Sequence, residues 1–251
     1  MAERTENLHT IELPHGTLYA TEDSSLAEKL AAAGENVLGI LTDGNETEPF
    51  HGVRYLIGKD TLRDKEYLDQ VLCRMKGLPV TILETKRCIL RESVPEDAGD
   101  FYRIYEDKAV KTYMEPLYET PREEEYLRQY RENVYAFYEY GIWTVVYKEN
   151  GQVIGRAGID PAEGEGPQLG YVIEKDYRSR GIAEEVCGAI IEYAGSALSL
   201  PCLTAVTQKD NAASCRLLEK LGFSRDGEPD GKILNISLIL HDDTKECGMI
   251  K

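Results

Sequence analysis

The sequence predicts an α/β protein in which helices pack on a sheet, preceded by a small α/β domain. Two observations predict this class. Stretches with the apolar spacing of helices alternate with short apolar runs of strand length over most of the chain. A strong hairpin signal, Glu149-Asn150-Gly151, also separates two of the predicted strands. We divide the chain into residues 1–83, residues 84–240 and a C-terminal tail, 241–251.

Composition limits the function classes. A hydrophobic share of 42% and a charged share of 29% fit a folded, soluble protein. No apolar run approaches the ~20 residues of a membrane helix, and the acidic N-terminus is unlike a signal peptide, so we expect a cytoplasmic protein without a membrane partner. The net charge of −16 repels nucleic acid and favours a cationic substrate such as a protonated amine, although it also serves solubility.

Cysteine and histidine spacing predicts no metal. None of the six cysteines lies in a CxxC pair, and the four histidines are scattered. We therefore expect neither a zinc site nor a disulfide scaffold, and mostly buried apolar thiols.

The first domain is predicted from five elements. Strands are expected at 17–20, 37–41 and 53–57, and helices at 24–34 and 64–76. Ser24 or Ser25 is the expected N-cap of the first helix. Residues 78–84 are predicted to form a linker.

The second domain is longer. A strand at 87–92 precedes a helix whose capping box would be Ser93 with Glu96, and a further helix runs from Thr120 to Gly141. Beyond it, strands are predicted at 143–147, 152–159, 168–174, 202–207 and 233–240, and helices at 182–194 and 211–221.

The turn between residues 174 and 182 has the properties of an anion site. The first turn of a helix carries unpaired N–H groups and the positive end of the helix dipole, where a phosphate group fits. Gly181 allows close approach of such a group, and three cations stand at this one turn of an acidic protein: Lys175, Arg178 and Arg180. A solvated basic turn with a glycine cap explains the cluster alone equally well.

Arg178-x-x-Gly181-x-Ala183 resembles the pyrophosphate loop R/Q-x-x-G-x-G/A of the GNAT superfamily of N-acetyltransferases. The segment from Asn211 to Phe223 resembles the N-x-x-S/A…G-F segment of the same family, and its Lys-Leu-Gly-Phe ending is similar to the ribosomal-protein N-terminal acetyltransferases. The element order from 87 to 240 also matches. The resemblance covers about 85–240, and it implies a mixed, splayed central sheet; residues 1–83 resemble no family that we identify.

The resemblance implies acetyl-CoA as co-substrate and assigns residues to it. The pyrophosphate would be held by the loop residues Arg178, Ser179, Arg180, Gly181, Ile182 and Ala183. The pantetheine arm would pair with the strand edge at Val172 and Ile173. Asn211 and Ser214, at the start of the 211–221 helix, would lie near the pantetheine and the sulfur. An N–H within 171–173 could hold the thioester oxygen. Leu218 stands where many relatives carry a tyrosine acid, which leaves Ser214 as the nearest substitute.

Glu174 is the candidate base, and its alternative is a surface carboxylate paired with Lys175 or Arg178. The expected reaction moves an acetyl group to a primary amine, either a protein N-terminus or a small molecule, by direct attack in a monomer or homodimer. The alternative is a non-catalytic acyl-CoA-binding or regulatory module. Residues 1–83 could also recruit a protein or RNA substrate, though they are acidic. Acceptor pockets of this family would involve residues 107–120 and 161–167.

Overall fold

The computed structural model describes residues 8–161, 166–225 and 232–240, and divides into two compact units, 1–80 and 81–251. Each unit is considered by itself. Among the described residues, no helix combines the length and the apolar character that crossing a bilayer demands.

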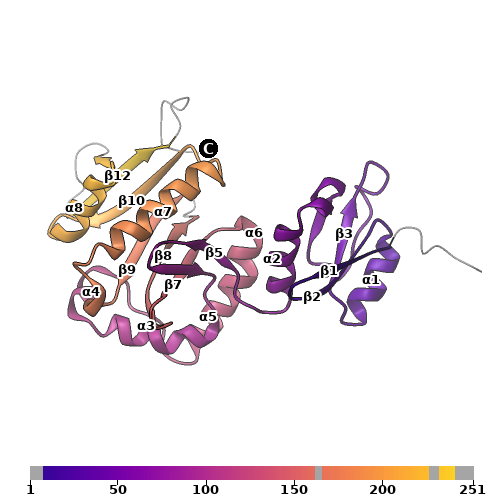
Figure 1. The fold of residues 1–251 in the computed structure, drawn as a ribbon, viewed down its shortest axis with the longest axis horizontal. Coiled ribbons are helices and arrows are strands. Elements are labelled where there is room, and N and C mark those ends of the chain that lie inside the picture. The colour runs from indigo at the N-terminus through magenta and orange to yellow at the C-terminus, as the bar shows by residue number, and fades with distance from the viewer. Residues whose placement is uncertain (1–7, 162–165, 226–231, 241–251) are drawn as a thin grey trace, which may run out of the picture. The chain divides into compact units, whose positions relative to one another are not determined.

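The first unit is a four-stranded sheet in the order β1-β2-β3-β4, coloured indigo to violet in Figure 1. Its strands are β1 (Leu8–Leu13), β2 (Gly16–Thr21), β3 (Val37–Leu41) and β4 (Leu56–Gly58), and its helices are α1 (Ser24–Ala32) and α2 (Lys65–Met75). The hairpin strand β1 was not predicted, because its polar, alternating side chains give a weak strand signal. The helix N-caps are Asp23 and Asp64, so the predicted serine cap was wrong.

The second unit is built on one mixed sheet of eight strands in the order β11-β12-β10-β9-β8-β7-β6-β5. The strands are β5 (Thr81–Glu84), β6 (Cys88–Arg91), β7 (Ile142–Tyr147), β8 (Val153–Asp160), β9 (Gln168–Ile173), β10 (Cys202–Gln208), β11 (Ser224–Arg225) and β12 (Ile233–Ile239). Every pair is antiparallel except β9 with β10. The predicted linker is therefore partly a strand, since β5 pairs with β6.

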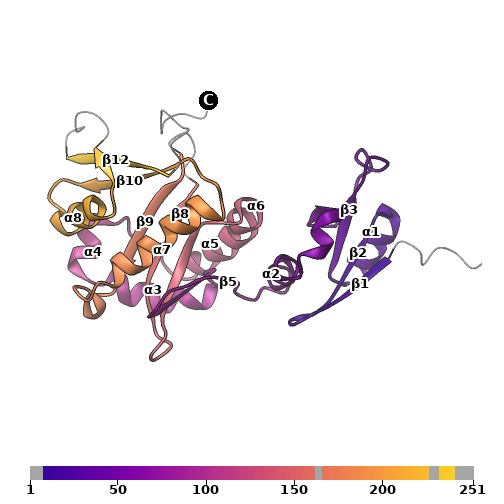
Figure 2. The ribbon, with the colours of Figure 1, turned by 45° about the horizontal axis from the view of Figure 1, so that its top comes forward.

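Helices cover both faces of this sheet. Helix α7 (Ile182–Ser196) lies on one face, whereas α3 (Ala98–Tyr105), α4 (Lys108–Tyr113) and α5 (Arg122–Tyr130) lie on the other (Figures 1 and 2). A π-helical turn (Arg131–Tyr135) and α6 (Ala136–Tyr138) extend α5 through the rest of the predicted 120–141 helix. Helix α8 (Ala212–Lys220) follows β10.

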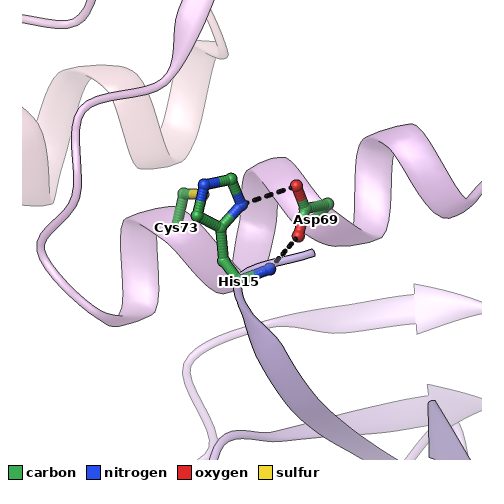
Figure 3. Close-up of side chains that lie close together, drawn as sticks. All are labelled: His15, Asp69 and Cys73. Carbon is green, nitrogen blue, oxygen red and sulfur yellow. Dashed lines mark hydrogen bonds and ion pairs between the residues drawn. The ribbon is translucent and has the colours of Figure 1, made fainter. Parts of the chain in front are cut away.

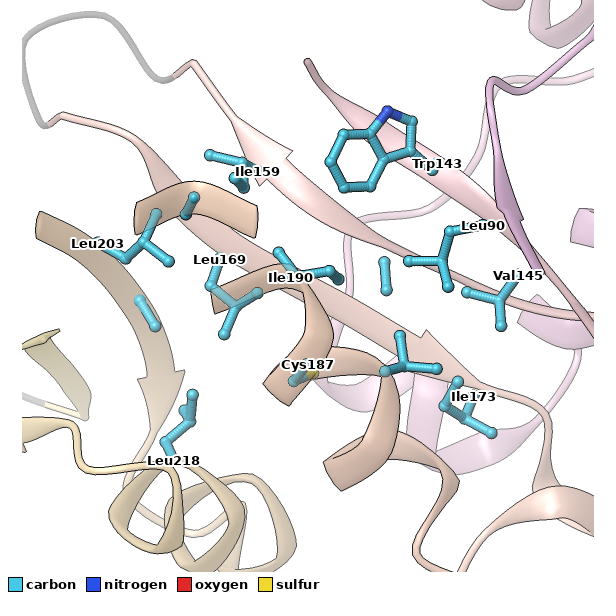
Figure 4. Packing of buried hydrophobic residues seen from close by; sticks show 14 of the residues in the cluster. Leu90, Trp143, Val145, Ile159, Leu169, Ile173, Cys187, Ile190, Leu203 and Leu218 are labelled. Carbon is cyan, nitrogen blue, oxygen red and sulfur yellow. The ribbon is translucent and has the colours of Figure 1, made fainter. Parts of the chain in front are cut away.

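The main core lies between α7 and the sheet. Figure 4 shows Ile190 and Cys187 of α7 among side chains of the strands, and Trp143 at one end of the cluster. Val186, Ile190 and Trp143 are fully buried, as the apolar spacing of the sequence predicted for the helix. This packing fixes the start of α7 against the end of β9.

One predicted cap was wrong in the second unit. The N–H of Val94 donates to the Asp97 carboxylate at 3.0 Å, whereas Ser93 is buried and its N–H donates to the Tyr135 hydroxyl. Among the described cysteines, Cys73, Cys88 and Cys187 are buried free thiols, as expected. Cys202 differs, because it is disulfide-bonded.

Candidate functional site

Strands β9 and β10 meet at one point and then separate. Their only recorded pair among the described residues is Gln168 with Thr204, where the Thr204 N–H donates to the Pro167 carbonyl at 2.9 Å. In contrast, β9 pairs with β8 along its whole length. The parallel neighbours therefore splay, and one side of β9 keeps main-chain groups available for another extended chain.

The register shows which groups these are. The Glu174 N–H donates to the Ile154 carbonyl at 2.7 Å, and main-chain direction alternates along an antiparallel strand. Val172 therefore faces β8, whereas the main chains of Tyr171 and Ile173 face away from it. We call this side of Tyr171 and Ile173 the open edge; of its groups, the Ile173 carbonyl already accepts from Arg178 Nε at 2.7 Å. The sequence predicted that Val172 and Ile173 would form this edge. The register shows that it is formed by Tyr171 and Ile173, because the main chain of Val172 faces β8.

The loop after β9 presents the start of α7. Gly181 is the N-cap with φ 74° and Ser179 has φ 58°, so two left-handed residues bracket Arg180. No side chain caps α7 in the described structure, and its first-turn N–H groups, those of Ile182 and Ala183 among them, have no carbonyl partner within the helix. Such uncapped N–H groups can receive an anion.

Two carboxylates in the first turn of α7 would oppose an anion, and each is paired with a cation. Glu184 contacts Lys220 at 2.7 Å, and Glu185 contacts the Arg87 guanidinium at 2.6 Å. Burial raises the pKa of Glu185, but hydrogen bonds from Thr85 and Arg87 outweigh it and leave the pKa lowered. Arg87 thus pairs with one of the two carboxylates, that of Glu185.

Arg87 also braces the loop itself. Its Nη1 donates to the Arg180 carbonyl at 2.7 Å, and its main-chain N–H donates to Glu185 at 2.8 Å. The side chain of Arg180 is exposed, as are those of Ser179 and Lys175. Arg87, at the start of the predicted strand 87–92, is thus hydrogen-bonded to the loop between β9 and α7. The linear sequence does not indicate this contact.

The Arg178 side chain is hydrogen-bonded to groups of β9 and α4. Its Nε donates to the Ile173 carbonyl at 2.7 Å, and its Nη1 donates to Asp107 at 2.9 Å. Asp107 is the N-cap of α4, where it accepts from Ala109 and Val110. The side chain therefore joins the end of β9 to α4, and it must release these partners to reach a phosphate.

The start of α8 contributes the second group of predicted site residues, Asn211 and Ser214. Asn211 caps the helix and accepts from the Ser214 N–H at 3.2 Å, and the Ser214 hydroxyl lies 3.2 Å from the Tyr171 hydroxyl. Leu218 is 2% exposed and belongs to the apolar core. Burial raises the pKa of Tyr171 to about 12. The Tyr171 side chain brings a phenol to Ser214 that the sequence did not identify.

Glu174 is held by two donors. One carboxylate oxygen pairs with Arg103 of α3, and the other accepts from Gln152 Nε2 at 3.2 Å. The alternative reading from the sequence, a surface carboxylate paired with Lys175 or Arg178, was wrong about the partner, because the cation that pairs with Glu174 is Arg103. A base at this position must release one of these hydrogen bonds before it can contact an amine.

A mixed cluster in the first unit has ligand types that bind metals. Atoms of His15, Asp69 and Cys73 lie within 4.8 Å of one another (Figure 3). However, both Asp69 oxygens already accept from His15, from its N–H at 3.2 Å and from Nδ1 at 2.8 Å. The arrangement is explained as a tether between the β1–β2 turn and α2.

The site can be compared with known proteins. The family model described as "Acetyltransferase (GNAT) domain" matches residues 87–224. The chain belongs to the GNAT acetyltransferase family. N-acetyltransferase YoaA of Bacillus subtilis (strain 168), itself named as uncharacterized, is 31% identical to this GNAT protein over 153 residues, covering 58% of this chain and 84% of YoaA.

Solved GNAT structures share the fold of the second unit. The ribosomal-protein-S5-alanine acetyltransferase from Vibrio fischeri matches with a TM-score of 0.54 and 18% identity, over 65% of this chain and 98% of that one. Spermidine N-acetyltransferase from Vibrio cholerae, solved with CoA and spermine, matches with a TM-score of 0.51 and 17% identity, over 61% and 95%. The predicted fold class and the prediction of an acetyl-CoA-dependent acyltransferase are confirmed.

Proposed function

We propose that this GNAT enzyme transfers the acetyl group of acetyl-CoA directly to a primary amine, on a protein N-terminus or a small molecule. The amine nitrogen attacks the thioester carbonyl carbon, and the C–S bond breaks as the C–N bond forms. The pantetheine amides pair with the open edge, and the diphosphate binds the start of α7 (Ser179, Arg180, Gly181, Ile182, Ala183). Asn211 and Ser214 stand beside the sulfur end.

The observation that carries the proposal is the single pair between β9 and β10. Because β9 separates from β10 after this pair, the edge of β9 offers main-chain amide groups, and the uncapped start of α7 that follows offers an anion site. CoA carries its pantetheine amides and its diphosphate in the same order. The N–H groups of Tyr171 and Ile173 can also stabilise the oxyanion that develops on the thioester oxygen.

The protonation state of the amine selects the acceptor class. A lysine ammonium with a pKa of about 10.4 is almost wholly charged at neutral pH, whereas an α-amine near 8 is about a tenth neutral. An enzyme whose candidate base, Glu174, is occupied by Arg103 and Gln152 should prefer α-amines and other amines of low pKa. We retain Glu174 as the base in this proposal, acting directly or through water.

The test combines binding with turnover. Calorimetric titration of the full chain with CoA and acetyl-CoA should show uptake of both. Thiol release from acetyl-CoA should then be measured against amines graded by pKa, and rates should rise as the amine pKa falls toward 8. CoA uptake without thiol release for any amine would favour a non-catalytic binding module, and no uptake would overturn the proposal.

A further inference from the structure

The hydrogen bond between Tyr171 and Ser214 connects the two walls of the site. Tyr171 is in the middle of β9 and Ser214 is in the first turn of α8, 43 residues apart in sequence. The main chain of Tyr171 faces the open edge, whereas its side chain packs on the core beneath α7. One residue therefore contributes both to the proposed thioester edge and to the proposed sulfur end.

The direction of this hydrogen bond decides what Ser214 can do. Each hydroxyl has a single proton, so if Tyr171 donates to Ser214 Oγ, the proton of Ser214 must point elsewhere. Burial keeps the pKa of Tyr171 near 12, so the phenol remains a donor at every working pH. The Ser214 N–H is already committed to Asn211, which fixes the serine backbone at the same time.

The residue one turn further along α8 cannot perform this task. Leu218, one turn further along, is apolar and buried, so it supplies neither a donor nor an acceptor. The phenol at this end of the site comes from β9 and contacts Ser214.

We propose that Tyr171 is a positioning residue: by donating to Ser214 Oγ, it turns the Ser214 proton toward the departing sulfur. This inference rests on the proposed function. The sulfur leaves with the electron pair of the C–S bond and accepts a hydrogen bond from Ser214; it later takes a proton from water, and the acylated amine loses one to Glu174, directly or through water. Tyr171 and Ser214 supply hydrogen bonds only, so neither is consumed.

The experiment is a double-mutant cycle in the full chain with Tyr171→Phe, Ser214→Ala and both changes together. For Tyr171→Phe, kcat should fall about tenfold, the effect of one hydrogen bond to a developing charge, while CoA affinity stays unchanged. The double variant should be no slower than Ser214→Ala alone, because Tyr171 acts through the serine. Tyr130→Phe is the matched control: it also removes a buried phenol, one that accepts from the Ile142 N–H, and kcat should not change.

The outcomes separate this inference from the proposed function. A wild type that turns over acetyl-CoA, with Tyr171→Phe equally fast, overturns the inference alone. Multiplicative losses in the double variant would give Tyr171 an effect independent of Ser214 and would also overturn it. A wild type that neither binds CoA nor releases thiol overturns both.

Discussion

Arg178 donates to Asp107 at 2.9 Å and to the Ile173 carbonyl at 2.7 Å, so one guanidinium joins the cap of α4 to the end of β9. The same short helix ends at Tyr113, whose hydroxyl lies 3.3 Å from the Asp210 carbonyl, next to the cap of α8. Helix α4 is thus attached to both walls of the site. It lies within residues 107–120, the segment in which we expect acceptor binding.

The Asp107 contact should make stability depend on pH. Burial raises the pKa of Asp107, but the hydrogen bonds from Arg178, Val110 and Ala109 outweigh it and hold the pKa below its ordinary value of 3.8. A depressed folded-state pKa contributes stability that is present above 3.8 and is lost as pH falls through the lower, folded value. Asp107→Asn keeps a residue that can cap α4 but removes the charge that pairs with Arg178, so it should destabilise by about 1 kcal/mol at pH 7 and by progressively less below pH 4. Urea unfolding over this pH range measures the difference, and Glu106→Gln, an exposed neighbour, should show none of it. A constant penalty at every pH would contradict the linkage.

Gly181 offers a sharper test of the anion site. Gly181→Ala adds a methyl group that meets only Arg87 Nη2 at 3.7 Å, but the φ of 74° is strained for alanine by about 1–2 kcal/mol. Gly151, in the β7–β8 turn, has φ 71° and nothing within 4 Å. Both alanine variants should lose similar stability, whereas only Gly181→Ala should weaken CoA binding, by tenfold or more. Equal CoA affinities in calorimetry would remove the start of α7 from the binding site.

Arg87 should act on CoA binding through charge. Arg87→Met removes the partner of Glu185 and leaves that carboxylate facing the bound diphosphate, so CoA affinity should fall about tenfold. Adding Glu185→Gln removes the uncompensated charge and should recover part of the loss. The salt dependence of the CoA dissociation constant is the measurement, since only a charge effect is screened. If the double variant binds no better than Arg87→Met, the loop brace to Arg180 is the dominant role.

The burial of Cys88 and Cys187 should determine the order in which the cysteines react with a thiol reagent. Burial, and secondarily Glu185, raises the pKa of Cys88 to about 11, and burial alone raises the pKa of Cys187. The thiolate is the reactive form, so both stay inert at pH 8 in the folded protein. Cys215, which is partly exposed, should react first with iodoacetamide, as peptide mass mapping over time would show. Early modification of Cys187 would mean that the α7 core opens.

Local patterns predicted the parts of the site that follow one another along the chain. The strand before Glu174, the glycine at the start of α7 and the helix beginning at Asn211 were all predicted from neighbouring residues, because capping and helix starts are local. Tyr171, Arg87 and Asp107 act through contacts with residues 43, 98 and 71 positions away, and no periodicity encodes such pairs. The contact between the Arg178 side chain and Asp107 could not be predicted for the same reason. The predicted acceptor segment 161–167 falls partly outside the described residues, and the predicted tail, 241–251, lies wholly outside them.

A buried ion pair between α5 and β8 yields the last prediction. Glu123 and Arg156 have side chains only 2% and 11% exposed, with Oε1 and Nη1 4.0 Å apart. The guanidinium also lies 4.6 Å from the centre of the Phe101 ring, and the second Glu123 oxygen accepts from the Tyr118 N–H at 3.1 Å. Removing one partner leaves the other charge buried and uncompensated, so Glu123→Ala should cost about 3–5 kcal/mol.

Replacing both charges should cost much less than the two single changes added together, because Arg156→Met with Glu123→Leu leaves no charge to desolvate. Trp143 is the single tryptophan and is fully buried in the second unit, so its fluorescence during urea unfolding reports on this unit alone. Costs that simply add would mean that the two groups are stabilised by their other neighbours. In that case Tyr105, whose hydroxyl shares a hydrogen bond with Arg156, is the next partner to remove.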